Sequence, residues 1–275
     1  ARSLAPAAAE VARLDAPAAA PLEAVLGLDR AGAQAEADRC RHMLAGIYAG
    51  LGETDLALTV LDTLAENLDG PDNLPHRAQV LEESGGLLYD ADRDALAAQR
   101  FAAAATAWRL AGFQVDEMRA RRRELLALHW SGDLPAAVAA IERVDEAAAA
   151  LPAEADEAPV VTYERAMAAD AVARVLIGED RLTAALDRVD GVPERLRSIE
   201  AFGEAAQVEV LTGELLLRDG RPEQAEGLLR PVLGGLPSGS RPATQAAWLL
   251  ARALDEQGRE AEASKVRADH GIEED

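Results

Sequence analysis

The sequence of 275 residues contains one cysteine, Cys40, and only three residues each of Phe, Trp and Tyr. A single cysteine excludes an intramolecular disulfide framework and any site built from several thiolates. We expect Cys40 to be a small buried hydrophobe. Strand-favouring Val, Ile and Thr are also sparse beside Ala, Leu, Glu and Arg, which favour helices. The sequence therefore predicts an all-α fold.

Positive charge is scarce as well. The formal net charge of -21 repels a phosphate backbone and an anionic bilayer, so we expect no direct nucleic-acid partner and no membrane partner.

No apolar run approaches the about 18 residues of a transmembrane helix, and the first residues lack the continuous apolar segment of a secretory signal. We expect a cytoplasmic protein. Because the chain begins with Ala, we also expect it to be a fragment or a processed product.

Signatures of catalysis and of metal binding are missing from the sequence. The only lysine, Lys265, follows Ser264, which excludes a phosphate loop of the GK[ST] type. Ser238 lacks the glycines two positions before and two positions after it that a nucleophile elbow requires. The four histidines include no pair at the four-residue spacing that favours metal ligation on one helix face. We predict a non-enzymatic protein with no catalytic residue, no cofactor and no metal site.

What the chain does contain is a repeated pattern. Alanines that follow turn signals recur at intervals of 40, 40, 48, 40 and 38 residues, at Ala57, Ala97, Ala137, Ala185, Ala225 and Ala263. Five residues before each lie residues that tolerate the left-handed conformation ending a helix: Gly52, Asp92, Gly132, Asp180, Gly220 and Gly258. Twelve residues before lie Ala45, Gly85, Leu125, Ala173, Gly213 and Ala251, and four residues after lie Leu61, Phe101, Ile141, Val189, Leu229 and Arg267.

This alternation of small and large residues indicates a helix, a tight turn and a second antiparallel helix in every repeat. The small residues let the two backbones approach, and the large residues fill the seams between them. About six stacked pairs then bury a continuous core, which predicts a right-handed αα-superhelix. After Val189 we expect a loop at 190–193 and the next helix at 203–218. The expected division is a leader or incomplete cap at 1–33, a solenoid at 34–270 with repeats near 38–76, 77–113, 114–156, 157–200, 201–240 and 241–270, and a frayed tail at 271–275.

The spacing resembles the tetratricopeptide repeat (TPR), in its longer form of about 40 residues as found in bacterial regulators. The resemblance covers residues 38–268. All six anchor alanines match it, and so do the small first-helix residues Ala45, Gly85, Gly213 and Ala251; the departures are Leu125, Asp92, Asp180 and Arg267. A polar Arg267 suits a terminal cap. The resemblance implies a scaffold that binds a peptide or protein along a concave surface lined by the first helix of each pair.

The third repeat, "RARRRELLALHW" at 119–130, concentrates polar and aromatic residues at the concave positions that the resemblance implies. Arg119 and Arg123 lie one helical turn apart and resemble the basic pair with which some relatives grip a C-terminal carboxylate. A guanidinium binds carboxylate bidentately, and a tryptophan can cover an apolar side chain. We therefore expect an acidic or C-terminal carboxylate segment as the ligand. The candidate peptide-binding residues are Arg119, Arg122, Arg123, Leu126, His129, Trp130, Arg174, Arg218 and Trp248.

Several alternatives stay open at this stage. The arginines can instead pair with Glu82, Asp170 or Glu214 on neighbouring helices, and Trp130 and Trp248 can fill seams between repeats. We expect Trp108, in a second helix, to lie in the core. The chain can also be the sensor or regulatory region of a larger transcriptional or signalling regulator. Self-association into a homo-oligomer is a further option.

Overall fold

The computed structural model describes residues 30–151 and 158–272, and within these ranges it contains helices and no strands. The chain divides into two compact units, residues 1–113 and 114–275. This division falls at one of the expected repeat boundaries. The remaining boundaries stay predictions, and most of the expected N-terminal leader and C-terminal tail lies outside the described residues. In the described part, no helix is both long and apolar enough to cross a bilayer.

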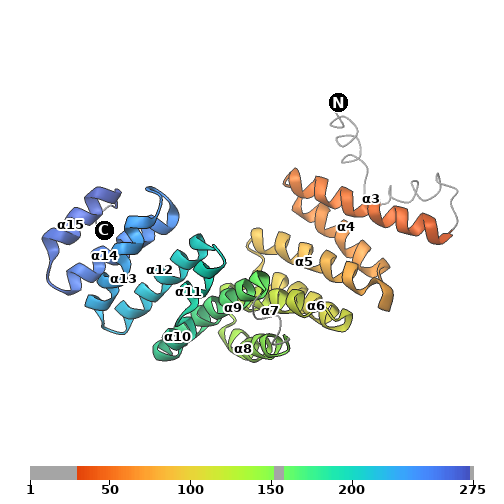
Figure 1. Ribbon diagram of the computed structural model, residues 1–275. Coiled ribbons are helices and arrows are strands. Elements are labelled where there is room, and N and C mark those ends of the chain that lie inside the picture. Colours follow the sequence, from red (N-terminus) through yellow and green to blue (C-terminus); the bar gives the residue numbers. More distant parts are fainter. Residues whose placement is uncertain (1–29, 152–157, 273–275) are drawn as a thin grey trace. The chain divides into compact units, whose positions relative to one another are not determined.

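Unit 1 consists of antiparallel helix pairs in the part that the structure describes (Figure 1). The first pair and the second pair are joined by a short 3-10 turn. Pro71 begins this turn. The elements are α3 (Arg30–Gly50), α4 (Thr54–Asn67), η2 (Pro71–Asn73), α5 (Leu74–Asp90) and α6 (Asp94–Ala111).

Unit 2 continues the same alternation of first and second helices (Figure 1). Asp133 and Ser240 cap two of its helices, because their side chains accept hydrogen bonds from the backbone N–H groups of Ala136 and Ala243. The helices are α7 (Gln114–Trp130), α8 (Leu134–Ala149), α9 (Pro159–Gly178), α10 (Leu182–Val189), α11 (Val192–Ser198), α12 (Phe202–Arg218), α13 (Pro222–Gly235), α14 (Arg241–Glu256) and α15 (Glu260–His270).

The turns and anchors of the predicted repeat are confirmed. Every anchor alanine is fully buried, so each lies at a close contact between helices. The residue five positions earlier is left-handed in all six repeats, including Asp92 at φ 55° and Asp180 at φ 57°, where aspartate replaces glycine. At Gly220 the following N–H, from Arg221, donates to the carbonyl of Leu216 at 2.9 Å and closes the helix end.

Small first-helix residues make room for large second-helix residues. A Cβ atom added to Gly85 would lie 2.7 Å from the Phe101 ring, and one added to Gly213 would lie 2.6 Å from the Leu229 side chain. The third repeat reverses this arrangement, because Leu125 is fully buried and its partner Ile141 is only partly buried. The departure of Leu125 from the pattern is therefore accommodated by a shallower position for Ile141.

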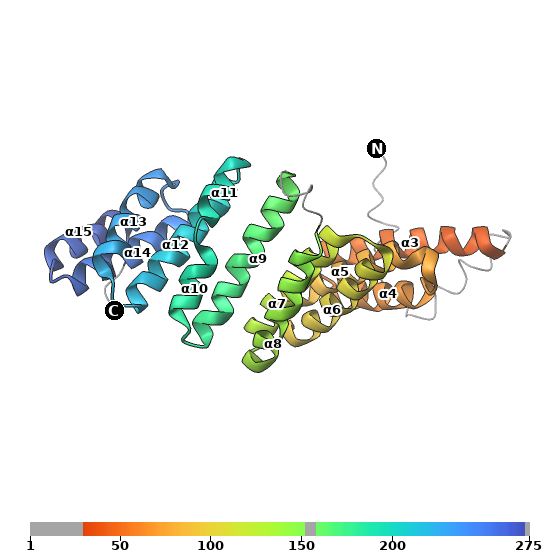
Figure 2. The ribbon, with the colours of Figure 1, turned by 60° about the horizontal axis from the view of Figure 1, so that its bottom comes forward.

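The prediction of a loop at 190–193 is wrong, because the loop is shorter than expected. Helix α10 stops at Val189, and a second short helix, α11, begins at Val192 and packs against α9 and α12 (Figure 2). Gly191, at φ 64°, makes the sharp change of direction. Val192 and Leu196 are fully buried, so α11 is part of the core of unit 2. The segment at 190–193, "DGVP", ends one helix but also begins another, since proline is well tolerated in the first turn of a helix.

Two smaller expectations have different outcomes. Cys40 is exposed, so the expectation of a buried thiol is wrong. It lies two positions, about 200° of helical rotation, beyond the buried Asp38 and thus on the opposite side of α3. Arg267 forms an ion pair with Asp255 of α14, so the polar residue in the last repeat has a polar partner.

Candidate functional site

The candidate site lies on the first-helix face of unit 2, by which we mean the surface formed by the first helix of each pair, α7, α9, α12 and α14. Two of the three tryptophans of the chain lie on these helices, and both are half exposed: Trp130 at 54% and Trp248 at 49%. Trp108 is buried, as predicted, and its Nε1 donates to Glu82 Oε2 at 2.8 Å. The alternative that Trp130 and Trp248 fill seams between repeats does not account for their exposure.

His129 supports Trp130 from one side. The two rings meet edge to face, with centroids 4.8 Å apart. The Nδ1 atom of His129 is buried without a hydrogen-bond partner in the described part of the chain. Burial, and secondarily the positive charge of Arg174, lowers the pKa of His129. The lowered pKa favours the neutral imidazole, and its ring packs against the indole.

The arginines of α7 have different environments. Arg119 Nη2 donates to Asp116 Oδ1 at 2.6 Å, within the same helix. Arg122 donates from Nε and Nη2 to Glu164 Oε2 of α9, both at 3.1 Å, and this pair is mostly buried. Arg122 therefore ties α7 to α9. Arg123 is half-buried and also has a partner, and Leu126 packs partly buried against the core of unit 2.

Arg174 of α9 and Arg218 of α12 pair with acids that the sequence suggested, but each pair lies within one helix and not, as expected, between neighbouring helices. Arg174 donates to both carboxylate oxygens of Asp170, at 2.8 and 3.0 Å. Arg218 Nη2 donates to Glu214 Oε1 at 2.8 Å, and its side chain is 44% exposed. Arg252 of α14 has a similar contact with Glu256, at 2.9 Å. These intrahelical pairs fix the guanidinium groups near the surface.

One ion network within the basic motif was not expected from the sequence. Arg121 and Glu124 of α7 are both buried and lie 2.8 Å apart. Arg143 of α8 donates to the second oxygen of Glu124 at 2.6 Å. The run of arginines in "RARRRE" thus serves two purposes, because Arg121 stabilises the helix pair and does not lie on the first-helix face. Helical phase separates the two roles. Arg121 finds its acid partner within α7, and only Arg143 reaches Glu124 from another helix.

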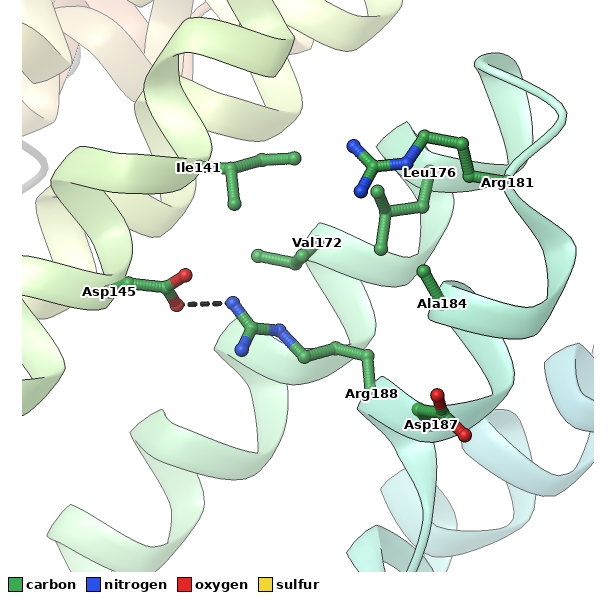
Figure 3. A pocket seen from close by; sticks show the side chains of 8 residues that line it. All are labelled: Ile141, Asp145, Val172, Leu176, Arg181, Ala184, Asp187 and Arg188. Atoms are coloured by element: carbon green, nitrogen blue, oxygen red, sulfur yellow. Dashed lines mark hydrogen bonds and ion pairs between the residues drawn. The ribbon is translucent and has the colours of Figure 1, made fainter.

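A separate pocket of about 350 Å³ lies between α8, α9 and α10 (Figure 3). Ile141, Val172, Leu176 and Ala184 provide its apolar surface, and Arg188 forms an ion pair with Asp145 at one end. The shallow position of Ile141 leaves its side chain at this pocket. The remaining lining residues are Arg181 and Asp187. The eight side chains include no Ser, Cys or His, and four of them are charged.

No group of three or more metal-ligating side chains is found among the described residues. The one histidine of the candidate site, His129, has its Nδ1 atom buried. The arrangement of the first-helix face therefore offers apolar contact through indoles and hydrogen bonds through guanidinium groups.

No protein-family model and no curated protein matches the sequence. Among solved structures, the nearly identical TPR-like repeats of a putative kinesin light chain from Podosopora anserina are similar over 70% of this chain and 93% of their own, with 16% identity and a TM-score of 0.54. An assembly chaperone of RpL4 (Acl4) is similar over 86% of this chain and 92% of its own, with 17% identity and a TM-score of 0.50.

The chain has a TPR-like repeat fold. The TPR resemblance inferred from alanine spacing is thereby confirmed at the level of fold. TPR-like helix pairs also explain why the anchor alanines and left-handed turns recur in register in both units. Fold alone does not assign a ligand, so the role of the TPR-like first-helix face has to be argued from its side chains.

Proposed function

We propose that the protein is a non-enzymatic interaction scaffold that binds an acidic peptide or protein segment on the first-helix face of unit 2. The observation that carries this proposal is the half exposure of Trp130 and Trp248 on α7 and α14. Tryptophan and arginine are the residues that most often dominate binding energy at protein interfaces. Each indole can cover an apolar side chain of the ligand and lose its contact with water.

The charges on this face favour an acidic ligand. The chain carries a net charge of -21, yet this face presents Arg218 and Arg252, both more than 40% exposed. A guanidinium group has five N–H donors, and Arg218 donates one hydrogen bond to Glu214. Its other donors can bind a ligand carboxylate in the charge-assisted geometry that gives arginine its selectivity.

Residues of α7 complete the proposed surface in two ways. Arg119 and Arg123 lie one turn apart and form the candidate contact for a C-terminal carboxylate. Arg122 is buried against Glu164, so it positions α7 against α9 instead of contacting the ligand directly. His129 and Leu126 support the indole of Trp130 and the packing below it.

An array of synthetic peptides tests this proposal. It should contain each acidic peptide in three matched forms: with a free C-terminal carboxylate, with a C-terminal amide, and with Asp and Glu replaced by Asn and Gln. We expect the full chain to bind acidic peptides that also carry an apolar anchor, and to lose binding when the acids are replaced. Equal binding to the amide form would assign recognition to acidic side chains and would exclude the terminal carboxylate.

A pair of matched arginine variants locates the binding surface. Arg218 pairs with Glu214 four residues earlier on a first helix, and Arg230 pairs with Glu226 four residues earlier on the second helix α13. Both arginines are similarly exposed. We expect Arg218→Ala to weaken binding of an acidic peptide about tenfold, which corresponds to about 1.4 kcal/mol, and Arg230→Ala to leave it unchanged. Equal affinities of the two variants would overturn the assignment of the surface.

A further inference from the structure

Two histidines from different helices of unit 1 meet on the surface of that unit. His42 lies on α3 and His76 lies near the start of α5, 34 residues later. His76 Nε2 lies 3.4 Å from His42 Nδ1, and the two ring centroids are 5.5 Å apart. The sequence did not reveal this pair, because the four-residue spacing identifies only histidines that lie on the same helix.

A carboxylate fixes the orientation of the first histidine. His42 Nε2 lies 2.6 Å from Glu83 Oε2, and the other oxygen of Glu83 accepts a hydrogen bond from Gln79 Nε2 at 3.1 Å. A carboxylate accepts at His42 Nε2 only when that nitrogen carries the proton. The lone pair of neutral His42 is then on Nδ1, the atom that faces His76.

The separation of the two nitrogen atoms suits a tetrahedral metal ion. Nitrogen ligands lie about 2.0–2.1 Å from zinc, so two nitrogens 3.4 Å apart subtend an angle of about 110° at the metal. Histidine ligands commonly donate their other ring N–H to a carboxylate, which orients the ring. Glu83 stands in that relation to His42. The negative charge of Glu83 also favours a nearby cation.

We propose that His42 Nδ1 and His76 Nε2 bind one divalent transition-metal ion, with Glu83 as the outer carboxylate. Imidazole ligands select zinc, copper or nickel over magnesium and calcium. The structure shows no third protein ligand in the described residues, so water completes the coordination, and the side chains of His42 and Glu83 are exposed enough to admit it. The ion replaces the proton between the two rings and links α3 to α5. The site lies in unit 1, so it is independent of the function proposed for unit 2.

Calorimetric titration of the full chain with Zn²⁺ alone, in a non-chelating buffer, tests the site. We expect one Zn²⁺ ion per chain, and at least tenfold weaker binding for His42→Ala and for His76→Ala, since each removes a ligand. Glu83→Gln keeps the shape of the side chain and should weaken binding about 10- to 100-fold, as loss of an outer carboxylate does. His270→Ala, in α15 of unit 2, is the matched control and should bind as the wild type does.

A second readout protects the test against misfolded variants. Zn²⁺ should raise the midpoint of thermal unfolding of the wild type and of His270→Ala, because an ion that binds only the folded chain stabilises it. The same concentration of Mg²⁺ should not. Circular dichroism must show native helix content in each variant. If an alanine variant is not folded, the zinc affinity of Glu83→Gln tests the proposal instead. Zinc affinity that is unchanged in His76→Ala or in Glu83→Gln would overturn the proposal.

Discussion

At the scale of single residues, the buried carboxylate of Glu124 makes the most consequential contacts in α7. It neutralises the buried Arg121 and also accepts a hydrogen bond from Arg143. Glu124→Ala leaves Arg121 buried without a counter-charge, so we expect it to lower the free energy of unfolding by about 3–5 kcal/mol. Urea unfolding measures this. Glu142→Ala, an exposed position on α8, should change stability by less than about 0.5 kcal/mol, and an equal effect of the two changes would contradict the network.

His129 gives a prediction about pH. Because burial lowers its pKa in the folded chain, the unfolded chain binds more protons at this residue as the pH falls through about 6.5. The contribution of neutral His129 to stability is therefore complete above that pH and is lost below it. Wild type should lose more stability between pH 7.5 and pH 5.5 than His129→Gln, as measured by urea unfolding at both values. Identical losses in the two proteins would show that His129 does not titrate on unfolding.

At the scale of elements, the close approach of α12 and α13 depends on a missing side chain. A Cβ atom at Gly213 would lie 2.6–2.9 Å from atoms of Leu229. We expect Gly213→Ala to destabilise the protein by about 1–3 kcal/mol through overpacking. Gly227→Ala is the control, because no atom lies within 4 Å of a Cβ atom there, and it should stabilise α13 by about 0.5–1 kcal/mol. Thermal unfolding separates the two signs, and stabilisation by both changes would contradict the close contact.

Helix ends and turns could be predicted from the sequence because their causes are local. Gly52 and Asp180, for example, both end a helix in the left-handed conformation, which few residue types adopt readily. Helix α11 was missed because its existence depends on burial of Val192 and Leu196 against other helices. Neither the short length of α11 nor its position after a glycine indicates a core element. Local signals thus locate where a helix stops better than they locate where a short one begins.

The candidate site could be predicted only in part. The helical spacing placed Trp130 and Trp248 on first helices, where they are exposed. It did not separate Arg122, which is buried against Glu164, from the more exposed Arg218. That difference depends on which acid a neighbouring helix brings close, and the same reason explains why the meeting of His42 and His76 was not expected. Such contacts arise where one repeat stacks on the next. The repeat spacing therefore predicts where along its helix each residue lies, but it does not predict which side chain of the next repeat it contacts.

At the scale of the whole molecule, the repeat accounts for the fold class, while the charge distribution suggests the function. A strongly acidic chain that carries exposed indoles and arginines on the first helices of unit 2 would combine, under the proposed function, general repulsion of acidic partners with a local attraction for them. Long-range repulsion weakens with added salt, whereas contacts at a desolvated surface persist. Specific binding of an acidic segment is the consequence that we expect.

The affinity of the Trp130→Ala, Trp248→Ala double variant for an acidic peptide that the wild type binds tests this account most directly. Truncation of interface tryptophans typically costs about 2 kcal/mol or more, so we expect binding at least about thirtyfold weaker with native helix content. Leu96→Ala, which removes another exposed apolar side chain but on the second helix α6 of unit 1, should bind as the wild type does. Equal affinity of the double variant and the wild type would contradict the proposed role of the first-helix face.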